Sequence, residues 1–154
     1  MINCPTKRKI RWLNIIGEYT CECIASIPRR SWKHQNIIEI LSGLFITKGC
    51  LTHIRSDSGS KFIATALRNW LSNLNIATAN IEPGSPWENG YCESFNAHMR
   101  DEFLNGEIFD TLTKSEILTR QWVNLYNTPD CTALTVIDLL FLSLFLGLLN
   151  LVCS

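Results

Sequence analysis

Two stretches decide the fold of this chain, His53-Ile54-Arg55-Ser56-Asp57-Ser58-Gly59 and Ser85-Pro86-Trp87-Glu88-Asn89-Gly90-Tyr91-Cys92-Glu93-Ser94-Phe95-Asn96. The first predicts a short strand that ends at Asp57, where a serine and a glycine turn the chain. The second predicts the start of a helix that carries Glu93. Ligand sites in α/β sheets form at the carboxyl ends of strands, and Mg²⁺ prefers carboxylate oxygens. Asp57 and Glu93, with 35 residues between them, are therefore candidates to bind a divalent metal ion together.

The predicted helix of the second stretch has a well-defined start and two different faces. A capping box with a proline in the first turn is formed by Ser85, Pro86 and Glu88. One face, which we expect to pack on a sheet, carries Tyr91, Phe95, Met99 and Phe103 at four-residue steps. The other face carries Asn89, Glu93, Asn96 and Arg100. A polar face is usually only solvated, but together with a strand-end carboxylate it predicts a metal site at Glu93, with Arg100 able to meet a phosphate.

The rest of the chain alternates between strand and helix patterns. Strands are predicted at residues 10–17, 21–28, 52–57 and 76–81, and helices at residues 32–48, 61–74 and from a capping box at Thr113 and Glu116 onward. The first two strands are joined by a short turn and predict an antiparallel hairpin. Strands that alternate with helices after a hairpin predict an α/β fold with a mixed sheet.

Length and composition are those of a single globular domain. The 154 residues are 46% hydrophobic and 18% charged, and the net charge is zero. The charge is unevenly spread, because residues 1–61 carry ten Lys or Arg against four acids and residues 62–154 carry four against ten. The seven cysteines form no Cys-x-x-Cys pair, so we expect reduced, mostly buried thiols and no zinc. The polar N-terminus is not a signal peptide, and we expect a cytoplasmic protein.

A resemblance to a known family is carried by residues 53–59, 82–96, 100–107 and 122–127. These stretches resemble the integrase-type catalytic core of bacterial insertion-sequence transposases, a group related to retroviral integrases. The resemblance runs from Arg11 to Asn127, about three quarters of the chain. The family's spacing of an aspartate, 35 residues and a glutamate is present, and so is a basic residue seven positions after the glutamate.

The resemblance implies an RNase H-like mixed sheet flanked by helices, and it implies a role for each matched residue. Asp57 is similar to the family's second catalytic aspartate and Glu93 to its closing glutamate, and both would bind Mg²⁺ or Mn²⁺, two ions in the intact family. Arg100 would contact DNA, and Asn89 would support the site. Such enzymes cut DNA and then join the freed 3′-hydroxyl to a target phosphate. A further DNA contact is expected from the basic cluster of Lys7, Arg8 and Lys9, whose other interpretation is a solvated terminus.

The chain also departs from the family pattern at its N-terminal side. The family's first catalytic aspartate lies on the first strand of the sheet, at a position that falls before Met1. We therefore expect residues 1–128 to form a partial integrase core that lacks the first strand and one metal ligand. Gly17 stands where the family usually has an aspartate that opens a turn.

Residues 129–154 form a divergent apolar tail. Between Leu139 and Val152 only Ser143, Gly147 and Asn150 interrupt the apolar residues. Three interpretations stay open: a change of reading frame after Asn127, a buried helix that covers surface left bare by the missing strand, or a short membrane anchor. A membrane anchor is the least favoured of these, because a confident transmembrane helix needs about 20 apolar residues.

Three functions remain possible from the sequence. The first is a transposase catalytic-core fragment that is inactive alone. The second is a non-catalytic remnant that binds DNA, forms a homo-oligomer or assembles with a full-length transposase. The third is a small membrane-associated protein defined by its tail.

Overall fold

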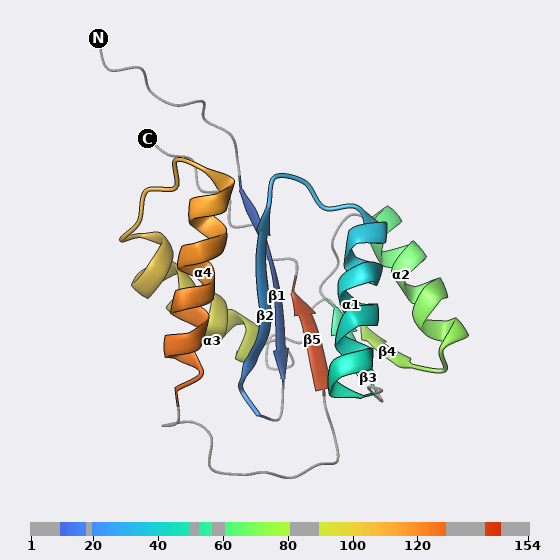
Figure 1. Cartoon of the computed structure of the whole chain (residues 1–154). Coiled ribbons are helices and arrows are strands. Elements are labelled where there is room, and N and C mark those ends of the chain that lie inside the picture. Colours follow the sequence, from blue (N-terminus) through green and yellow to red (C-terminus); the bar gives the residue numbers. More distant parts are fainter. Residues whose placement is uncertain are drawn as a thin grey trace.

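A computed structural model of the chain describes residues 10–17, 20–49, 53–56, 61–80, 90–128 and 141–145. A mixed sheet lies between two layers of helices (Figure 1). In chain order the elements are β1 (Arg11–Gly17), β2 (Cys23–Arg29), α1 (His34–Lys48), β3 (His53–Ser56), α2 (Lys61–Asn73), β4 (Ala77–Asn80), α3 (Gly90–His98), the π-helical segment η2 (Met99–Leu104), α4 (Leu112–Tyr126) and β5 (Phe141–Phe145). The α/β class and the mixed sheet predicted from the sequence are confirmed.

The opening hairpin forms as predicted. Strands β1 and β2 pair antiparallel, with a bulge between Ile15 and Ile16. The turn is closed by a hydrogen bond of 2.9 Å from the backbone N–H of Gly17 to the carbonyl of Glu22. A Cβ atom at Gly17 would collide with the hydroxyl of Thr20. Any larger residue here would force that hydroxyl to move, so the packing of Thr20 favours glycine at this position.

The sheet has the strand order β2-β1-β5-β3-β4, so a strand from the apolar tail lies at its centre (Figure 1). Strand β5 pairs antiparallel with β1 and parallel with β3, and β3 pairs parallel with β4. The sequence predicted a sheet without its first strand; the position between β1 and β3 is instead filled by β5. The interpretation of the tail as a buried helix is wrong for residues 141–145, which form strand β5. The facing edges of β1 and β3 carry backbone donors and acceptors, and a strand placed between them can pair with both edges. Within the described ranges, no helix is long and apolar enough to cross a membrane.

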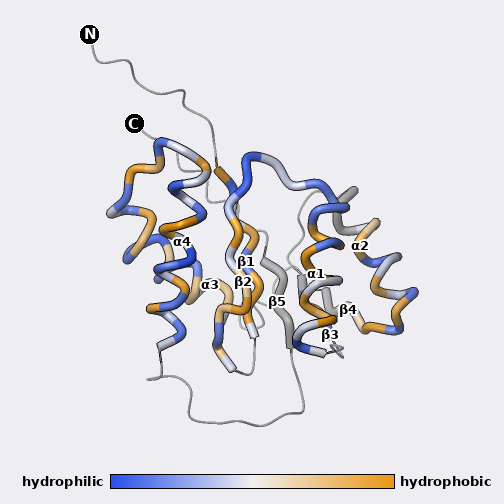
Figure 2. The backbone as a smooth tube through the Cα atoms, viewed as in Figure 1, coloured by the Kyte–Doolittle hydropathy of each residue, from blue (hydrophilic) through white to orange (hydrophobic). Residues whose placement is uncertain are grey.

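Each face of the sheet has its own hydrophobic core, because alternate residues of a strand point to opposite faces. Leu13 and Ile15 of β1 belong to the core that α1 and α2 cover. Trp12 and Ile16 belong to the core that α3, η2 and α4 cover. Figure 2 shows hydrophobic residues along β1 and β2, and an alternation of hydrophobic and hydrophilic residues along the helices.

Helix α4 starts earlier than predicted, and its buried face includes two polar residues. Its N-cap is Thr111, whose hydroxyl accepts a hydrogen bond of 3.1 Å from the backbone N–H of Lys114, so the predicted capping box at Thr113 is wrong. The buried face of the helix is formed by Ser115, Thr119 and Trp122. Leu125, which shares the apolar spacing, is 74% exposed. A small polar face is buried here because the indole N–H of Trp12 on β1 donates to the hydroxyl of Thr119 at 3.0 Å.

Candidate functional site

Two of the predicted site residues lie within the described part of the chain. Glu93 is on the first turn of α3 and Arg100 is in η2, and both side chains are exposed. Neither side chain makes a hydrogen bond or an ion pair within the described residues. Outside these residues lie Asp57, Asn89, Lys7, Arg8 and Lys9, together with the predicted capping box at residues 85–88. Strand β3 ends at Ser56, so Asp57 is the next residue after it in the sequence.

The apolar face of α3 and η2 holds Glu93 outward. Phe95, Met99 and Phe103 are buried as predicted. The ring of Phe95 contacts Trp122 and Tyr126 of α4 edge to face, with centroids 5.6 and 5.1 Å apart. Because these aromatic contacts fix the rotation of the helix, the Glu93 carboxylate faces solvent and can meet a cation.

Asn96 was predicted to share the exposed polar face, and the structure shows it buried at 7% exposure. Its Oδ1 accepts a hydrogen bond of 3.1 Å from Nδ2 of Asn14 on β1. The Oδ1 of Asn14 in turn accepts 2.7 Å from the hydroxyl of Ser26 on β2. A polar link therefore runs from β2 through β1 to α3. Sequence reasoning missed Asn14, although one polar residue within the apolar run of β1 was a usable signal.

The register of the sheet places this polar link near the end of β3. Ser56, the last residue of β3, pairs with Leu144, and Leu144 pairs with Ile15 on β1. Phe145 follows Leu144 and pairs with Asn14. Asn14 therefore stands one residue beyond the row in which β3 ends. Since Asn14 binds Asn96, the sheet holds α3 at the end of β3, three residues from Glu93.

Arg100 lies in a segment with π-helical hydrogen bonds, where the sequence predicted a regular helix. The backbone N–H of Asn105 donates to the carbonyl of Arg100 at 2.9 Å, five residues back. The wider turn lets the consecutive residues Phe103 and Leu104 both be buried. Short π-helical segments within helices are frequent at functional sites.

The thiols of the described residues are structural. Cys21, Cys23 and Cys92 form no disulfide, and Cys23 and Cys92 are buried, as expected for reduced cysteines. Burial raises the pKa of the Cys23 thiol to about 12, and the Glu22 carboxylate adds to the increase. Among the described ranges no three His, Cys, Asp or Glu side chains gather into a metal-binding group.

Comparisons with known proteins agree with the resemblance seen in the sequence. Residues 74–129 match the family of the integrase core domain. The chain is 29% identical over 120 residues to an uncharacterized 39.2 kDa protein of insertion element IS476 from Xanthomonas euvesicatoria. It is 28% identical over 120 residues to an uncharacterized 31.7 kDa protein of insertion element IS407 from Burkholderia multivorans. Each alignment covers 78% of this chain but only 35% and 43% of these relatives. No solved structure matches the chain.

Proposed function

We propose that this chain, which carries an integrase-type core of the insertion-element kind, is a transposase catalytic-core fragment built for DNA cleavage and strand transfer. The observation that carries the proposal is the match of residues 74–129 to the integrase core domain, because this range contains both Glu93 and Arg100. Both side chains are exposed on one continuous helical segment, where a metal ion and a phosphate could reach them.

An RNase H-like arrangement is part of this proposal. The mixed sheet with helices on both faces supports it (Figure 1). Parallel strands β3 and β4 are preceded by an antiparallel hairpin, as the family resemblance implies.

Asp57 and Glu93 are the proposed metal ligands. The residues suit Mg²⁺ or Mn²⁺, because carboxylate oxygens are hard ligands and the exposed Glu93 has no competing ion pair within the described residues. Bound metal would supply activation of an attacking oxygen and stabilisation of the leaving oxygen at phosphorus. Arg100 would bind a DNA phosphate, Asn89 would support the carboxylates, and Lys7, Arg8 and Lys9 would add contacts to the DNA backbone.

We also propose that this chain does not cut DNA on its own. Metal-dependent chemistry of this kind uses a third carboxylate, and the strand that lies beside β3 at the centre of the sheet reads Phe-Leu-Ser-Leu-Phe. Strand β5 therefore offers no acidic side chain. DNA binding and assembly with a complete transposase are the activities that remain for this chain.

Metal binding by the purified chain tests the assigned ligands. In a Mn²⁺ titration followed by electron paramagnetic resonance, we expect Asp57→Asn and Glu93→Gln each to weaken binding by about tenfold or more. Glu102→Gln is the matched control, because Glu102 is an exposed acid of the same helical segment and should leave the affinity unchanged. Equal Mn²⁺ affinity in all four proteins would overturn the ligand assignment.

Nicking of a supercoiled plasmid tests the second half of the proposal. We expect the chain with Mg²⁺ or Mn²⁺ to leave the plasmid intact, at the level of the Glu93→Gln variant. Nicking by the wild-type chain that disappears in Glu93→Gln would show an active enzyme and would contradict the proposed inactivity.

A further inference from the structure

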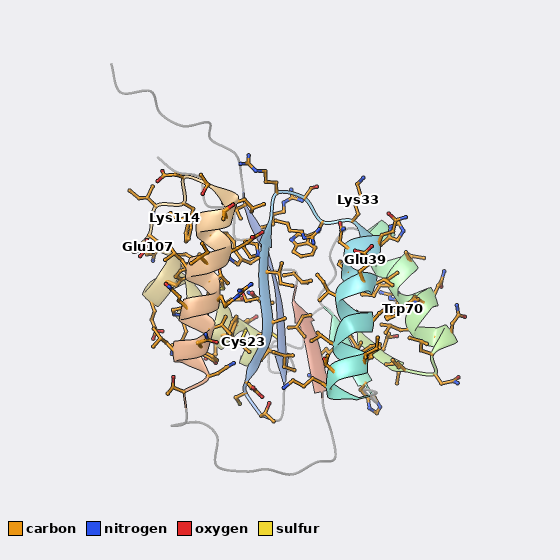
Figure 3. All side chains as sticks on the ribbon, in the orientation of Figure 1. Cys23, Lys33, Glu39, Trp70, Glu107 and Lys114 are labelled. Atoms are coloured by element: carbon orange, nitrogen blue, oxygen red, sulfur yellow. The ribbon has the colours of Figure 1, made fainter. Side chains whose placement is uncertain are left out.

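Four basic residues gather at one end of the sheet, and none of them belongs to the proposed metal site. Arg11 begins β1, Arg29 ends β2, and Arg30 and Lys33 lie in the connection to α1. Arg30 and Lys33 are exposed, and Arg11 and Arg29 are half-buried. Figure 3 shows Lys33 at the end of α1 where the chain arrives from β2, beside the end of the sheet at which β1 begins. We call these four residues the basic end.

A buried tryptophan holds the basic end together. The guanidinium of Arg29 lies over the ring of Trp32 at 5.3 Å from its centroid. The indole N–H of Trp32 donates to the backbone carbonyl of Arg11 at 3.1 Å. Trp32 is itself buried against the core below α1 and α2. The Arg29 side chain is thus restrained by a cation–π contact, and little conformational freedom remains for a ligand to remove.

The basic end concentrates positive charge that no acidic side chain of the described residues pairs with. Arg11 and Arg29 stand directly opposite each other in the antiparallel pair, an arrangement in which like charges repel. None of the four residues has an acidic partner within the described part of the chain. This clustering costs folding stability unless an anionic partner binds there, so it points to recognition of a polyanion rather than to a role in folding.

The basic end lies at the same end of the sheet as the carboxyl end of β3. Strands β3 and β5 run antiparallel to β1, so the start of β1 and the end of β3 lie toward the same end of the sheet. Ser56 reaches the row of Ile15, four residues from Arg11 along β1. A strand advances about 3.3 Å per residue, so the basic end is about 13 Å from the row where β3 ends. That separation is a few phosphate spacings of a nucleic acid strand.

We infer that the basic end binds the phosphate backbone of duplex DNA and guides it across the end of β3. This inference rests on the proposed function for the identity of the polyanion, and it adds a DNA-contact surface to the predicted contacts at Arg100 and Lys7 to Lys9. Arg29, held by Trp32, and Arg30 contact successive phosphates. Lys33, at the start of α1, contacts a further phosphate. The recognition carries no base specificity, because phosphate contacts position DNA without reading its sequence.

Salt-dependent DNA binding by the full chain tests this surface. A fluorescent 20-bp duplex of random sequence is titrated in EDTA at several KCl concentrations, with fluorescence anisotropy as the readout. The triple variant Arg29→Gln, Arg30→Gln, Lys33→Gln should bind more weakly and show a shallower dependence of log K on log salt. The expected change is about 0.9 in the slope for each lost phosphate contact, so between two and three overall.

The control variant carries the same change in net charge elsewhere on the molecule. It combines Lys48→Gln, Arg68→Gln and Arg120→Gln, three exposed residues on α1, α2 and α4. We expect it to keep the wild-type slope. The double variant Arg30→Gln, Lys33→Gln leaves the contact between Arg29 and Trp32 intact, and it should lower the slope by about two even if the triple variant folds poorly.

Three outcomes overturn the inference. They are an unchanged slope in the double variant, an equal loss in the control variant, and competition by poly-glutamate as strong as that by DNA, which would indicate an acidic protein partner. Because EDTA removes the metal, the binding result does not depend on metal bound by the carboxylates. If the basic-end variants show a shallower salt slope but Mn²⁺ does not bind at Glu93, the basic end is supported and the metal site is refuted. If Mn²⁺ binds at Glu93 but the salt slope of the variants is unchanged, the metal site is supported and the basic end is refuted.

Discussion

Single polar residues inside the core decide how the elements of this protein meet. Asn14 is fully buried on β1, and its amide accepts a hydrogen bond from Ser26 and donates to Asn96 and to the sulfur of Met99. These bonds fix β2, β1 and the helical segment of α3 and η2 relative to one another. Burying an amide without hydrogen-bond partners is costly, so these bonds offset the cost of burying Asn14. An apolar residue at this position could pack against α3 but could not form the hydrogen bond to Asn96 that fixes the position of the helix. The position of Glu93, three residues from Asn96, would then be less well defined.

The thiol of Cys23 gives a prediction about pH at the same scale. Its pKa is about 12 in the folded chain, above the ordinary value of 9.0, so the folded state keeps the thiol proton where the unfolded state has lost it. The contribution of Cys23 to stability is complete below pH 9 and is lost as the pH rises toward 12. Replacing Cys23 with alanine should therefore flatten the fall in unfolding free energy over this range.

Urea unfolding of the wild type and of Cys23→Ala at several alkaline pH values is the measurement. The difference in unfolding free energy between the two proteins should shrink by as much as about 1.4 kcal/mol per pH unit. Parallel stability curves for the two proteins would show that the thiol titrates equally in the folded and unfolded states.

Helix α4 is attached to the edge of the sheet by one side chain at its C-terminal end. The Asn127 amide donates to the carbonyl of Cys23 at 2.8 Å and accepts from the N–H of Cys23 at 2.9 Å. Strand β2 lies at the edge of the sheet, and the two bonds from Asn127 satisfy backbone groups of Cys23 as a neighbouring strand would. Asn127 is the last residue of the stretch that resembles the family, and its structural role is to join helix α4 to strand β2.

Replacing Asn127 with alanine should detach this end of α4. The loss leaves a backbone donor and acceptor of a buried residue without partners, so we expect a loss of about 1 to 3 kcal/mol in the free energy of unfolding. Asn124→Ala is the control, because Asn124 is exposed on the same helix. Hydrogen exchange at the Cys23 amide should quicken in Asn127→Ala alone, and equal protection in both variants would refute the role of Asn127.

At the scale of the whole molecule, β5 joins two halves that are far apart in the sequence. Within the described sheet, the hairpin of β1 and β2 is hydrogen-bonded to the pair of β3 and β4 through β5, while the core below α1 and α2 adds side-chain packing between the two halves. Each half has open backbone groups along the edge that faces the other. The tail strand satisfies both edges, so we expect the sheet to unfold as one unit only while β5 is in place.

Proline at Ser143 tests this joining role. Proline removes a backbone N–H and is disfavoured at the centre of a sheet, so Ser143→Pro should cost about 3 kcal/mol or more and make unfolding less cooperative. Ser143→Ala keeps the backbone donor and is the matched control. Urea unfolding followed by tryptophan fluorescence and by circular dichroism should give coincident curves for Ser143→Ala and separate curves for Ser143→Pro. Equal stability of the two variants would mean that β5 does not hold the halves together.

Local patterns of the sequence were enough for most elements and for part of the site. Alternation in β1 and helical spacing in α1, α2 and α3 are properties of neighbouring residues, so the hairpin, the mixed sheet and the packing face with Phe95 and Met99 could be predicted. The candidates Asp57 and Glu93 came from motif and spacing. The apolar run of β1 singles out Asn14, but its partners Ser26 and Asn96 could not be predicted in this way, and neither could the basic end, because these pairings join residues far apart in the chain.

The sequence by itself determined the class of fold, the integrase-type resemblance and the exposed position of Glu93 on a helix with one apolar face. Only the tertiary structure decided which strand lies at the centre of the sheet, because β5 is chosen by the open edges of β1 and β3 and not by any pattern within residues 141–145. It also decided that Asn96 is buried, which depends on how α3 packs against β1, and that Arg11 faces Arg29, which depends on the register between β1 and β2. Hydrophobic periodicity fixes which face of an element is buried, whereas the partner of that face is set by packing and hydrogen bonds across the whole molecule.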